Sequence, residues 1–203
     1  MQMIIFDTET SGFSPNSRNI VQLSYLVDNG ELSGKNFYFA VDNVDEGAAA
    51  VHGLTVDKLA ELSEGYRFYD VVEEVLADFG AAKLLIAHNI KFDLSFLTAE
   101  VGRCGFSLTE VLKRDRKMVD TVCTMHSTTN FCKLPGKYGY KGPKLNELMD
   151  CLGIEISEVE EFCRQVFGDF EGFHDARFDV AGTYMAYKMA SEQGIMGGVA
   201  NGR

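Results

Sequence analysis

Two short apolar runs, each ending at a polar residue, constrain the fold of this chain more than any other feature. Residues 3–6 lead directly into Asp7, and residues 84–87 lead into His88. Short apolar runs bounded by polar residues are typical of strands buried within a sheet. Because strand ends converge at one edge of the sheet in α/β folds, we expect the residues that follow these two runs to lie close together.

The remaining pattern predicts a mixed sheet. Strands are expected at residues 3–6, 20–27, 37–41, 84–87 and 117–121. The pairs Asn29-Gly30 and Ser33-Gly34 are turn signals between the early strands, which would be antiparallel. Asp120 is expected to cap the segment that follows the fifth strand. The predicted fold class is therefore α/β, with a mixed five-stranded sheet flanked by helices.

Apolar residues at helical spacing predict where the helices lie. They are expected at residues 69–79, 93–101, 145–152, 159–166 and 175–191. Thr55 is expected to cap a further short helix, and Asp175 to cap the last one. Residues 125–143 are expected to form a long irregular stretch. Its lysines and tyrosines either hold a nucleic-acid strand or form a plain surface insertion.

The length of 203 residues suits one α/β domain, which we expect at residues 1–193, followed by a flexible Gly-rich tail at 194–203. No apolar run reaches the roughly 18 residues of a membrane span, and the first residues do not resemble a signal peptide. The five cysteines are odd in number and include no C-x-x-C pair. They favour reduced thiols in a cytoplasmic protein over a zinc site.

The net charge of −11 argues against a nucleic-acid partner at first, because phosphate binding usually leaves a basic footprint. The distribution of charge is uneven, however. The segment 103–144 carries a local excess of basic residues, namely Arg103, Lys113, Arg114, Arg116, Lys117, Lys133, Lys137, Lys141 and Lys144. These residues either contact phosphates or solvate a long surface segment, and the sequence leaves both interpretations open.

Asp7 and Glu9 are two residues apart at the end of a predicted buried strand. Residues at this spacing point to the same face, so the two carboxylates would lie side by side. Adjacent anions at the edge of an apolar core either bind a proton or hold a cation between them. An isolated D-x-E is usually a surface turn, so the interpretation depends on what lies nearby.

Two further groups supply the missing partners. Asp93 follows the strand that ends at His88, at the start of a predicted helix, and His88 itself is expected to be a hydrogen-bonded structural histidine. His174 lies just before the last helix, and Asp179 lies one turn inside it on a face expected to point inward. Together these stretches offer four carboxylates and one histidine, a set suited to a two-metal phosphodiester hydrolase.

These residues carry a family resemblance. The motifs Phe6-Asp7-Thr8-Glu9-Thr10, His88-Asn89-x-x-Phe92-Asp93 and His174-x-Ala176-x-x-Asp179 resemble the three exonuclease motifs of the DEDDh family. The segment Val51-His52-Gly53-Leu54-Thr55 is similar to the epsilon-like and ribonuclease T group within that family. The resemblance extends over nearly the whole chain.

The resemblance implies a ribonuclease H-like fold and 3′→5′ removal of nucleoside 5′-monophosphates, with DNA as the favoured substrate. Asp7, Glu9, Asp93 and Asp179 would hold two divalent cations, and His174 would be the general base. The oxygen ligands suit Mg²⁺ or Mn²⁺. The terminal nucleotide would be bound by four further residues, Thr10, His52, Leu54 and Phe92.

The expected partners are single-stranded or frayed 3′ ends of DNA or RNA, with a polymerase as the candidate protein partner. Alternatives remain open at this point. One alternative is an RNA-processing exoribonuclease, and another is a proofreading subunit that depends on a polymerase. An inactive binding module and an endonuclease of ribonuclease H type are the competing classes. The motifs do not distinguish DNA from RNA.

Overall fold

A five-stranded mixed sheet forms the centre of the computed structural model, which describes residues 1–170 and 174–196. Its order is β3 (Leu32–Tyr38), β2 (Ile20–Asp28), β1 (Met3–Thr10), β4 (Leu84–Ala87) and β7 (Asp120–Cys123). β1 is antiparallel to β2, and β2 to β3, whereas β4 is parallel to both β1 and β7. The predicted mixed five-stranded sheet is confirmed.

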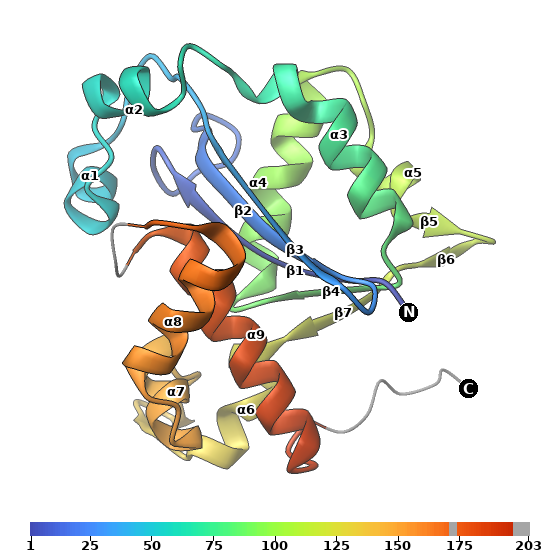
Figure 1. The fold of residues 1–203 in the computed structure, drawn as a ribbon, viewed down its shortest axis with the longest axis vertical. Helices are drawn as coiled ribbons and strands as arrows, with labels where there is room; N and C mark the ends of the chain where they lie inside the picture. The colour runs from blue at the N-terminus through green and yellow to red at the C-terminus, as the bar shows by residue number, and fades with distance from the viewer. Residues whose placement is uncertain (171–173, 197–203) are drawn as a thin grey trace.

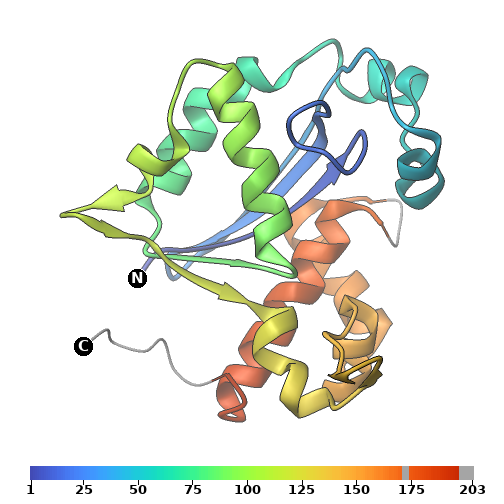
Figure 2. The same cartoon turned by 180° about the vertical axis from the view of Figure 1, so that it is seen from behind.

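Helices cover both faces of this sheet (Figures 1 and 2). α3 (Phe68–Ala81) and α4 (Ile90–Arg103) pack on one face, where Ile4 and Phe6 of β1 point. α9 (Ala176–Glu192) packs on the other face, where Ile5 of β1 meets Val180. The alternation of side chains along β1 therefore divides the core into two layers.

Shorter elements connect the layers. The helices are α1 (Glu46–His52), α2 (Val56–Leu62), α5 (Leu108–Val111), α6 (Thr124–Cys132), α7 (Leu145–Leu152) and α8 (Ile156–Phe167). Two short hairpins lie outside the central sheet, β5 (Lys113–Arg114) with β6 (Lys117–Met118), and β8 (Pro135–Gly136) with β9 (Gly139–Tyr140). Three helices, α6, α7 and α8, lie at the end of the molecule opposite α3 (Figure 1).

The predicted strand at residues 37–41 is wrong in position, because β3 covers Leu32–Tyr38. Ser33-Gly34 is not a turn but part of this strand. A Cβ at Gly34 would lie 2.7 Å from the side chains of Val166 and Phe167 in α8. The glycine thus reflects the close approach of a helix to the strand, a second common reason for glycine in a strand.

The predictions for residues 117–143 are wrong in two places. The fifth strand of the sheet is β7, so Asp120 begins a strand and caps no helix. The stretch 125–143 is only partly irregular, because α6 covers Thr124–Cys132 and a short hairpin follows it. α6 lacks a clear apolar stripe in its sequence, yet Thr124 and Thr128 are fully buried. Tertiary packing stabilises this helix where local propensity would not.

The other helix predictions agree with the structure within a few residues. α7 has the predicted bounds, and the Thr55 side chain accepts a hydrogen bond from Lys58 N at the start of α2. Asp175 caps α9 as expected. α4 begins at Ile90, three residues before its predicted start, so Asp93 lies inside the first turn of the helix.

Part of the predicted tail is packed against the domain. The amides of Ile195 and Met196 both donate to the carbonyl of Ala190, and Met196 is buried. The rest of that prediction, residues 197–203, lies outside the described residues. All five cysteines are free thiols. Within residues 1–170 and 174–196 no helix has the length and apolarity needed to cross a bilayer.

Candidate active site

Asp7 and Glu9 project from the C-terminal half of β1 toward α9. Ile5 contacts the α9 layer, and side chains two residues apart share a face, so Asp7 and Glu9 point to the same side. In the ladder with β2, Asp7 lies opposite Ser24, and Glu9 lies opposite Gln22. The ladder becomes irregular directly after Glu9. The strand therefore presents two partly buried carboxylates where its regular pairing ends.

Asp93 reaches the same strand from the opposite layer. It lies in the first turn of α4 and is only 2% exposed. Its Oδ1 accepts hydrogen bonds from Thr8 N (3.1 Å) and Thr8 Oγ1 (2.8 Å). Because Thr8 lies between Asp7 and Glu9 in the chain, these two bonds hold the Asp93 carboxyl group beside both.

Asp179 and His174 come from the start of α9. Asp179 is in the first turn of this helix, and His174 precedes the cap with a positive φ of 60° and an exposed side chain. Glu9, His174 and Asp179 each offer one potential ligand atom, and these atoms all lie within 4.8 Å of one another. The structure therefore brings together side chains from β1 and α9 that are far apart in sequence.

The four carboxyl groups are mutually destabilised as anions. Burial, followed by the charges of Asp93, Asp179 and Glu9, raises the pKa of Asp7 well above its ordinary value. Burial and neighbouring charges also raise the pKa of Glu9. Burial raises the pKa of Asp93 and of Asp179 to about 7. Each group favours a bound proton unless a cation compensates the charge.

Ion pairs do not relieve this repulsion. Within residues 1–170 and 174–196, no lysine or arginine nitrogen lies within 4 Å of a carboxylate of Asp7, Glu9, Asp93 or Asp179. One buried and three partly buried carboxylates without a lysine or arginine partner, together with a nearby imidazole, form an oxygen-rich donor set that fits hard divalent cations.

The start of α9 is fixed by a hydrogen-bonded group on its cap. Gln22 of β2 donates to Asp175 Oδ1 (2.9 Å) and accepts from Ala176 N (3.2 Å). Arg177 donates to both oxygens of Asp175, through Nε (2.9 Å) and Nη2 (2.6 Å). Burial alone would raise the pKa of Asp175, but Arg177 and Gln22 hold it below its ordinary value. Asp175 therefore remains charged and structural, as its predicted capping role requires.

Arg177→Ala is expected to lower the free energy of unfolding by about 3 kcal/mol, because it removes the guanidinium that neutralises the buried Asp175 carboxylate. The Arg177 and Asp175 side chains are only 13% and 5% exposed. Urea denaturation followed by circular dichroism measures the change. Arg67→Ala is the matched control, since its ion pair with Asp42 is exposed and should contribute less than about 1 kcal/mol. Equal losses in the two variants would contradict the account.

His52, the last residue of α1, lies beside the end of β1. Its Nδ1 accepts a hydrogen bond from Leu54 N (3.0 Å), so Nε2 carries the proton and donates to the carbonyl of Thr10 (3.1 Å). Burial lowers the pKa of His52, which keeps the ring neutral. His52 therefore ties the end of α1 to the end of β1. It lines a hollow together with Leu54, His174 and Asp175.

The other three predicted nucleotide contacts have different surroundings. Leu54 is 4% exposed and packs in a small cluster with Leu59, so it presents little surface to a ligand. The Thr10 hydroxyl is buried and donates to Gly12 O (2.7 Å). Phe92 is partly buried and packs on Phe96, with ring centroids 5.0 Å apart. Thr10 is the last residue of β1, Phe92 lies in the first turn of α4, and Leu54 lines the hollow that also contains His52 and His174.

A larger pocket adjoins the carboxylates on the α7 side. It has a volume of about 640 Å³, and Asp179 and His174 form part of its wall. Its other lining residues are His88, Asn89, Met125, Gly142, Pro143, Lys144, Leu145, Asn146 and Met149. Sequence reasoning did not select Met125, Asn146 or Met149. The only available signal was the start of the predicted helix at 145, directly after a Gly-Pro pair.

His88 connects this pocket to the sheet. Its Nε2 lies 3.0 Å from the carbonyl of Pro143 and therefore donates to it, while Nδ1 lies 2.9 Å from Thr124 Oγ1 and accepts. Burial lowers the pKa of His88 to about 4, so the ring stays neutral near physiological pH. The expectation of a hydrogen-bonded structural histidine is confirmed.

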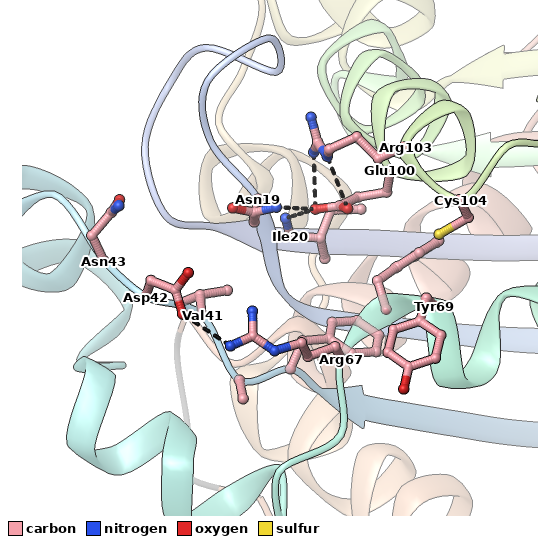
Figure 3. Close-up of a pocket in the computed structure, with 13 residues that line it drawn as sticks. Asn19, Ile20, Val41, Asp42, Asn43, Arg67, Tyr69, Glu100, Arg103 and Cys104 are labelled. Atoms are coloured by element: carbon pink, nitrogen blue, oxygen red, sulfur yellow. Dashed lines mark hydrogen bonds and ion pairs between the residues drawn. The ribbon is translucent and has the colours of Figure 1, made fainter.

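A separate pocket lies between the β3–α1 segment and α4, and none of the four carboxylates lines it (Figure 3). Glu100 of α4 is buried at its floor, where Oε1 accepts from Asn19 Nδ2 (3.1 Å) and Ile20 N (2.9 Å). Arg103 pairs with the same carboxylate. This group attaches α4, which carries Asp93, to the loop that follows β1.

Comparison with known proteins shows the protein family to which the chain belongs. The sequence profile of a family described as Exonuclease matches residues 4–159, more than half of the chain. The chain belongs to this exonuclease family.

Individual proteins with similar sequences include a polymerase subunit and a separate exonuclease. DNA polymerase III subunit epsilon of Salmonella typhimurium is 32% identical in an alignment of 147 positions, which covers 67% of this chain and 56% of that protein. The 3′-5′ exonuclease DinG of Bacillus subtilis is 30% identical over 148 residues, 72% of this chain and 15% of that protein. The chain thus spans about half of the first relative and a small part of the second.

Solved structures confirm the fold. Exonuclease I matches with a TM-score of 0.73 at 16% identity, over 94% of this chain and 41% of that chain. E. coli exonuclease I in complex with a dA16 oligonucleotide matches with a TM-score of 0.72 at 16% identity, over 94% and 41% of the two chains. The predicted ribonuclease H-like fold is confirmed by these matches.

Proposed function

We propose that this chain is a metal-dependent 3′→5′ exonuclease that releases nucleoside 5′-monophosphates from DNA ends. The observation that carries the proposal is the convergence of Asp7, Glu9, Asp93 and Asp179 from three separate elements, with His174 beside two of them. The family supports the reaction type. The oligonucleotide complex of exonuclease I supports single-stranded DNA as the substrate class.

The four carboxylates are the residues that would hold two divalent cations. Their burial and mutual repulsion, without a lysine or arginine partner among the described residues, fit a cation site. When bound, such ions supply charge neutralisation for the scissile phosphate and activate the attacking water. Mg²⁺ or Mn²⁺ is the proposed ion, because the donors are carboxylate oxygens.

The chain's own residues supply positioning and proton transfer. Thr8 holds Asp93 in place, and the Gln22, Asp175 and Arg177 group holds the start of α9, which carries Asp179. His174 is the proposed general base, whose imidazole nitrogen accepts a proton from the attacking water. The new bond joins this water oxygen to phosphorus while the bond between phosphorus and the 3′ oxygen breaks, and the 3′ oxygen of the shortened strand takes a proton from solvent. Asp175, paired with Arg177, takes no part in this transfer.

His52, Leu54, Thr10 and Phe92 are proposed to shape the site for the terminal nucleotide. The internal hydrogen bonds of His52 leave its side chain little capacity for a further polar contact, so its contribution would be to fix the end of β1. A polymerase is the proposed protein partner, by analogy with the name of the epsilon relative. The five free thiols support a cytoplasmic location.

The experiment that tests this function is a gel assay with single-stranded DNA and RNA of the same sequence, each labelled at the 5′ end. With Mg²⁺ we expect a ladder that shortens from the 3′ end, faster on DNA, and no change with chelator. A faster RNA ladder would identify the exoribonuclease alternative. Cleavage of a circular single strand would instead show an endonuclease and contradict the proposal.

Mg²⁺ is expected to stabilise the protein more at pH 8 than at pH 5. The raised pKa values of Asp93 and Asp179, about 7 against an ordinary 3.8, mean that the metal-free protein loses stability as the pH rises through that range. Bound cations reverse this loss. At about 100 times the dissociation constant, the melting temperature at pH 8 should rise by about 5–10 °C.

Differential scanning fluorimetry with Mg²⁺ and with chelator measures this effect. Asp179→Asn should remove most of the Mg²⁺-dependent shift. Asp150→Asn, an exposed residue of α7, changes the charge equally and should retain it. A shift of the same size at pH 5 and pH 8 would show that the clustered carboxylates do not bind the ion.

A further inference from the structure

We propose that the α6–α7 connection, residues 133–144, binds the single strand just upstream of the 3′-terminal nucleotide. This inference rests on the proposed exonuclease function and deepens it, because it gives the enzyme a surface for unpaired DNA beyond the reacting nucleotide. The connection contains the β8–β9 hairpin, and it is continuous with the wall of the pocket that adjoins the carboxylates.

Hydrogen bonds attach the connection to the site. Lys141 N donates to Leu134 O, which closes the base of the hairpin. The Pro143 carbonyl accepts from His88, at the end of β4 and next to the helix that carries Asp93. Gly142, Pro143 and Lys144 then line the same pocket as His174 and Asp179. A strand that leaves the carboxylates through this pocket therefore passes along the connection.

Two tyrosines of the hairpin are exposed. Tyr138 is 90% exposed and Tyr140 is 55% exposed. The Lys137 ammonium lies 5.1 Å from the centre of the Tyr138 ring. Exposed aromatic faces beside cations suit unpaired nucleotides, because bases stack on the rings while the phosphates meet the charges. Bases in a duplex are already stacked, so this chemistry selects a single strand.

The charge of the connection is complementary to phosphate. It contains four lysines, Lys133, Lys137, Lys141 and Lys144, and no acidic residue. Lys141 pairs with Glu147 at 2.5 Å, which leaves three exposed lysines. On a chain with a net charge of −11, this local excess opposes the general repulsion of nucleic acid. An acidic protein partner would not need the exposed rings.

The structure also divides the basic segment noted in the sequence. Lys113, Arg114, Arg116 and Lys117 belong to the β5–β6 hairpin, which projects from the opposite side of the molecule to α6 and α7 (Figures 1 and 2). Only the α6–α7 connection adjoins the carboxylates. The β5–β6 hairpin therefore offers a control of similar charge and size at a distance from the site.

The test is fluorescence anisotropy with a 5′-labelled oligo-dT of about 15 nucleotides in chelator, which prevents hydrolysis. Lys133→Gln with Lys137→Gln should weaken binding by about tenfold and reduce the slope of log affinity against log salt by roughly 1.4. Tyr138→Ala with Tyr140→Ala should weaken binding at least about fivefold. Lys113→Gln with Lys117→Gln should leave binding within about twofold of the wild type.

Hydrolysis of a dinucleotide separates this inference from the proposed function. None of the substituted residues 133, 137, 138 and 140 lines the pocket that adjoins the carboxylates. Turnover of a dinucleotide bound in that pocket should therefore be unchanged in these variants, whereas turnover of the longer strand should fall. Wild-type affinity in the connection variants, or equal loss in the β5–β6 control, would overturn the inference while leaving the exonuclease intact. Connection-dependent binding without any hydrolysis would support the surface and refute the exonuclease.

Discussion

Asp7→Asn is expected to lower the rate of hydrolysis by about 10³-fold or more without unfolding the protein. Asp7 is close to all three of the other carboxylates, since the charges of Asp93, Asp179 and Glu9 all raise its pKa. Losing a carboxylate that is proposed to hold the cations should remove several kcal/mol of transition-state stabilisation, which corresponds to about three orders of magnitude. Single-turnover hydrolysis of a labelled strand measures the loss.

The same substitution should not reduce the stability of the metal-free protein, because it removes one of four repelling carboxylates. Asp28→Asn is the matched control. Asp28 lies opposite Met3 at the other end of the β1–β2 ladder, so it changes the charge equally but far from the site. Near-normal activity in Asp7→Asn, or an equal loss in Asp28→Asn, would refute the metal site.

His174→Ala is expected to lower kcat by about 10²- to 10⁴-fold, the usual contribution of a general base. The Mg²⁺-dependent rise in melting temperature should remain, because the four carboxylates are unchanged. Steady-state kinetics and thermal melts on the same preparation give both quantities. His126→Ala, an exposed histidine of α6, should retain both.

The histidine variant also separates two roles for His174. Its imidazole is close enough to Glu9 and Asp179 to act as a metal ligand, since the three potential ligand atoms lie within 4.8 Å of one another. A variant that lost the Mg²⁺ stabilisation together with activity would identify His174 as a ligand. Loss of turnover with retained stabilisation supports the general base.

The bounds of β4 could be predicted because all four of its residues are apolar and buried. The bounds of α7 could be predicted because its buried residues, Leu148, Met149 and Leu152, are apolar and recur at helical spacing. β3 could not be placed correctly, since its exposed start carries few apolar side chains and Gly34 resembled a turn. What fixes Gly34 in a strand is the approach of α8, which local sequence does not encode.

α6 could not be predicted for a related reason. Its sequence is rich in threonine, serine and asparagine, which have low helix propensity. Thr128 Oγ1 donates to the carbonyl of Thr124, four residues earlier, so a polar side chain is satisfied inside the helix. Contacts with the rest of the fold stabilise this helix, and they are visible only in three dimensions.

The candidate site was more predictable than the fold around it. Paired acidic residues after a buried strand, and a histidine before a helix, select Asp7, Glu9, His174 and Asp179, which the structure brings together. The surroundings were less accessible to sequence reasoning. Neither the hydrogen bonds that engage His52 nor the attachment of Pro143 to His88 has a signal in the sequence, because both connect distant segments.

The central claim is that the clustered carboxylates of β1, α4 and α9 remove one nucleotide at a time from a 3′ end. The most direct test uses single-stranded DNA with radioactive phosphorus only in its last internucleotide linkage, followed through one turnover with Mg²⁺. We expect the label to leave as a nucleoside 5′-monophosphate with the wild type and to stay in the strand with Asp7→Asn. Release of the label in a longer fragment, retention of the label as the 3′-phosphate of a shortened strand, or equal release by Asp7→Asn would contradict this expectation.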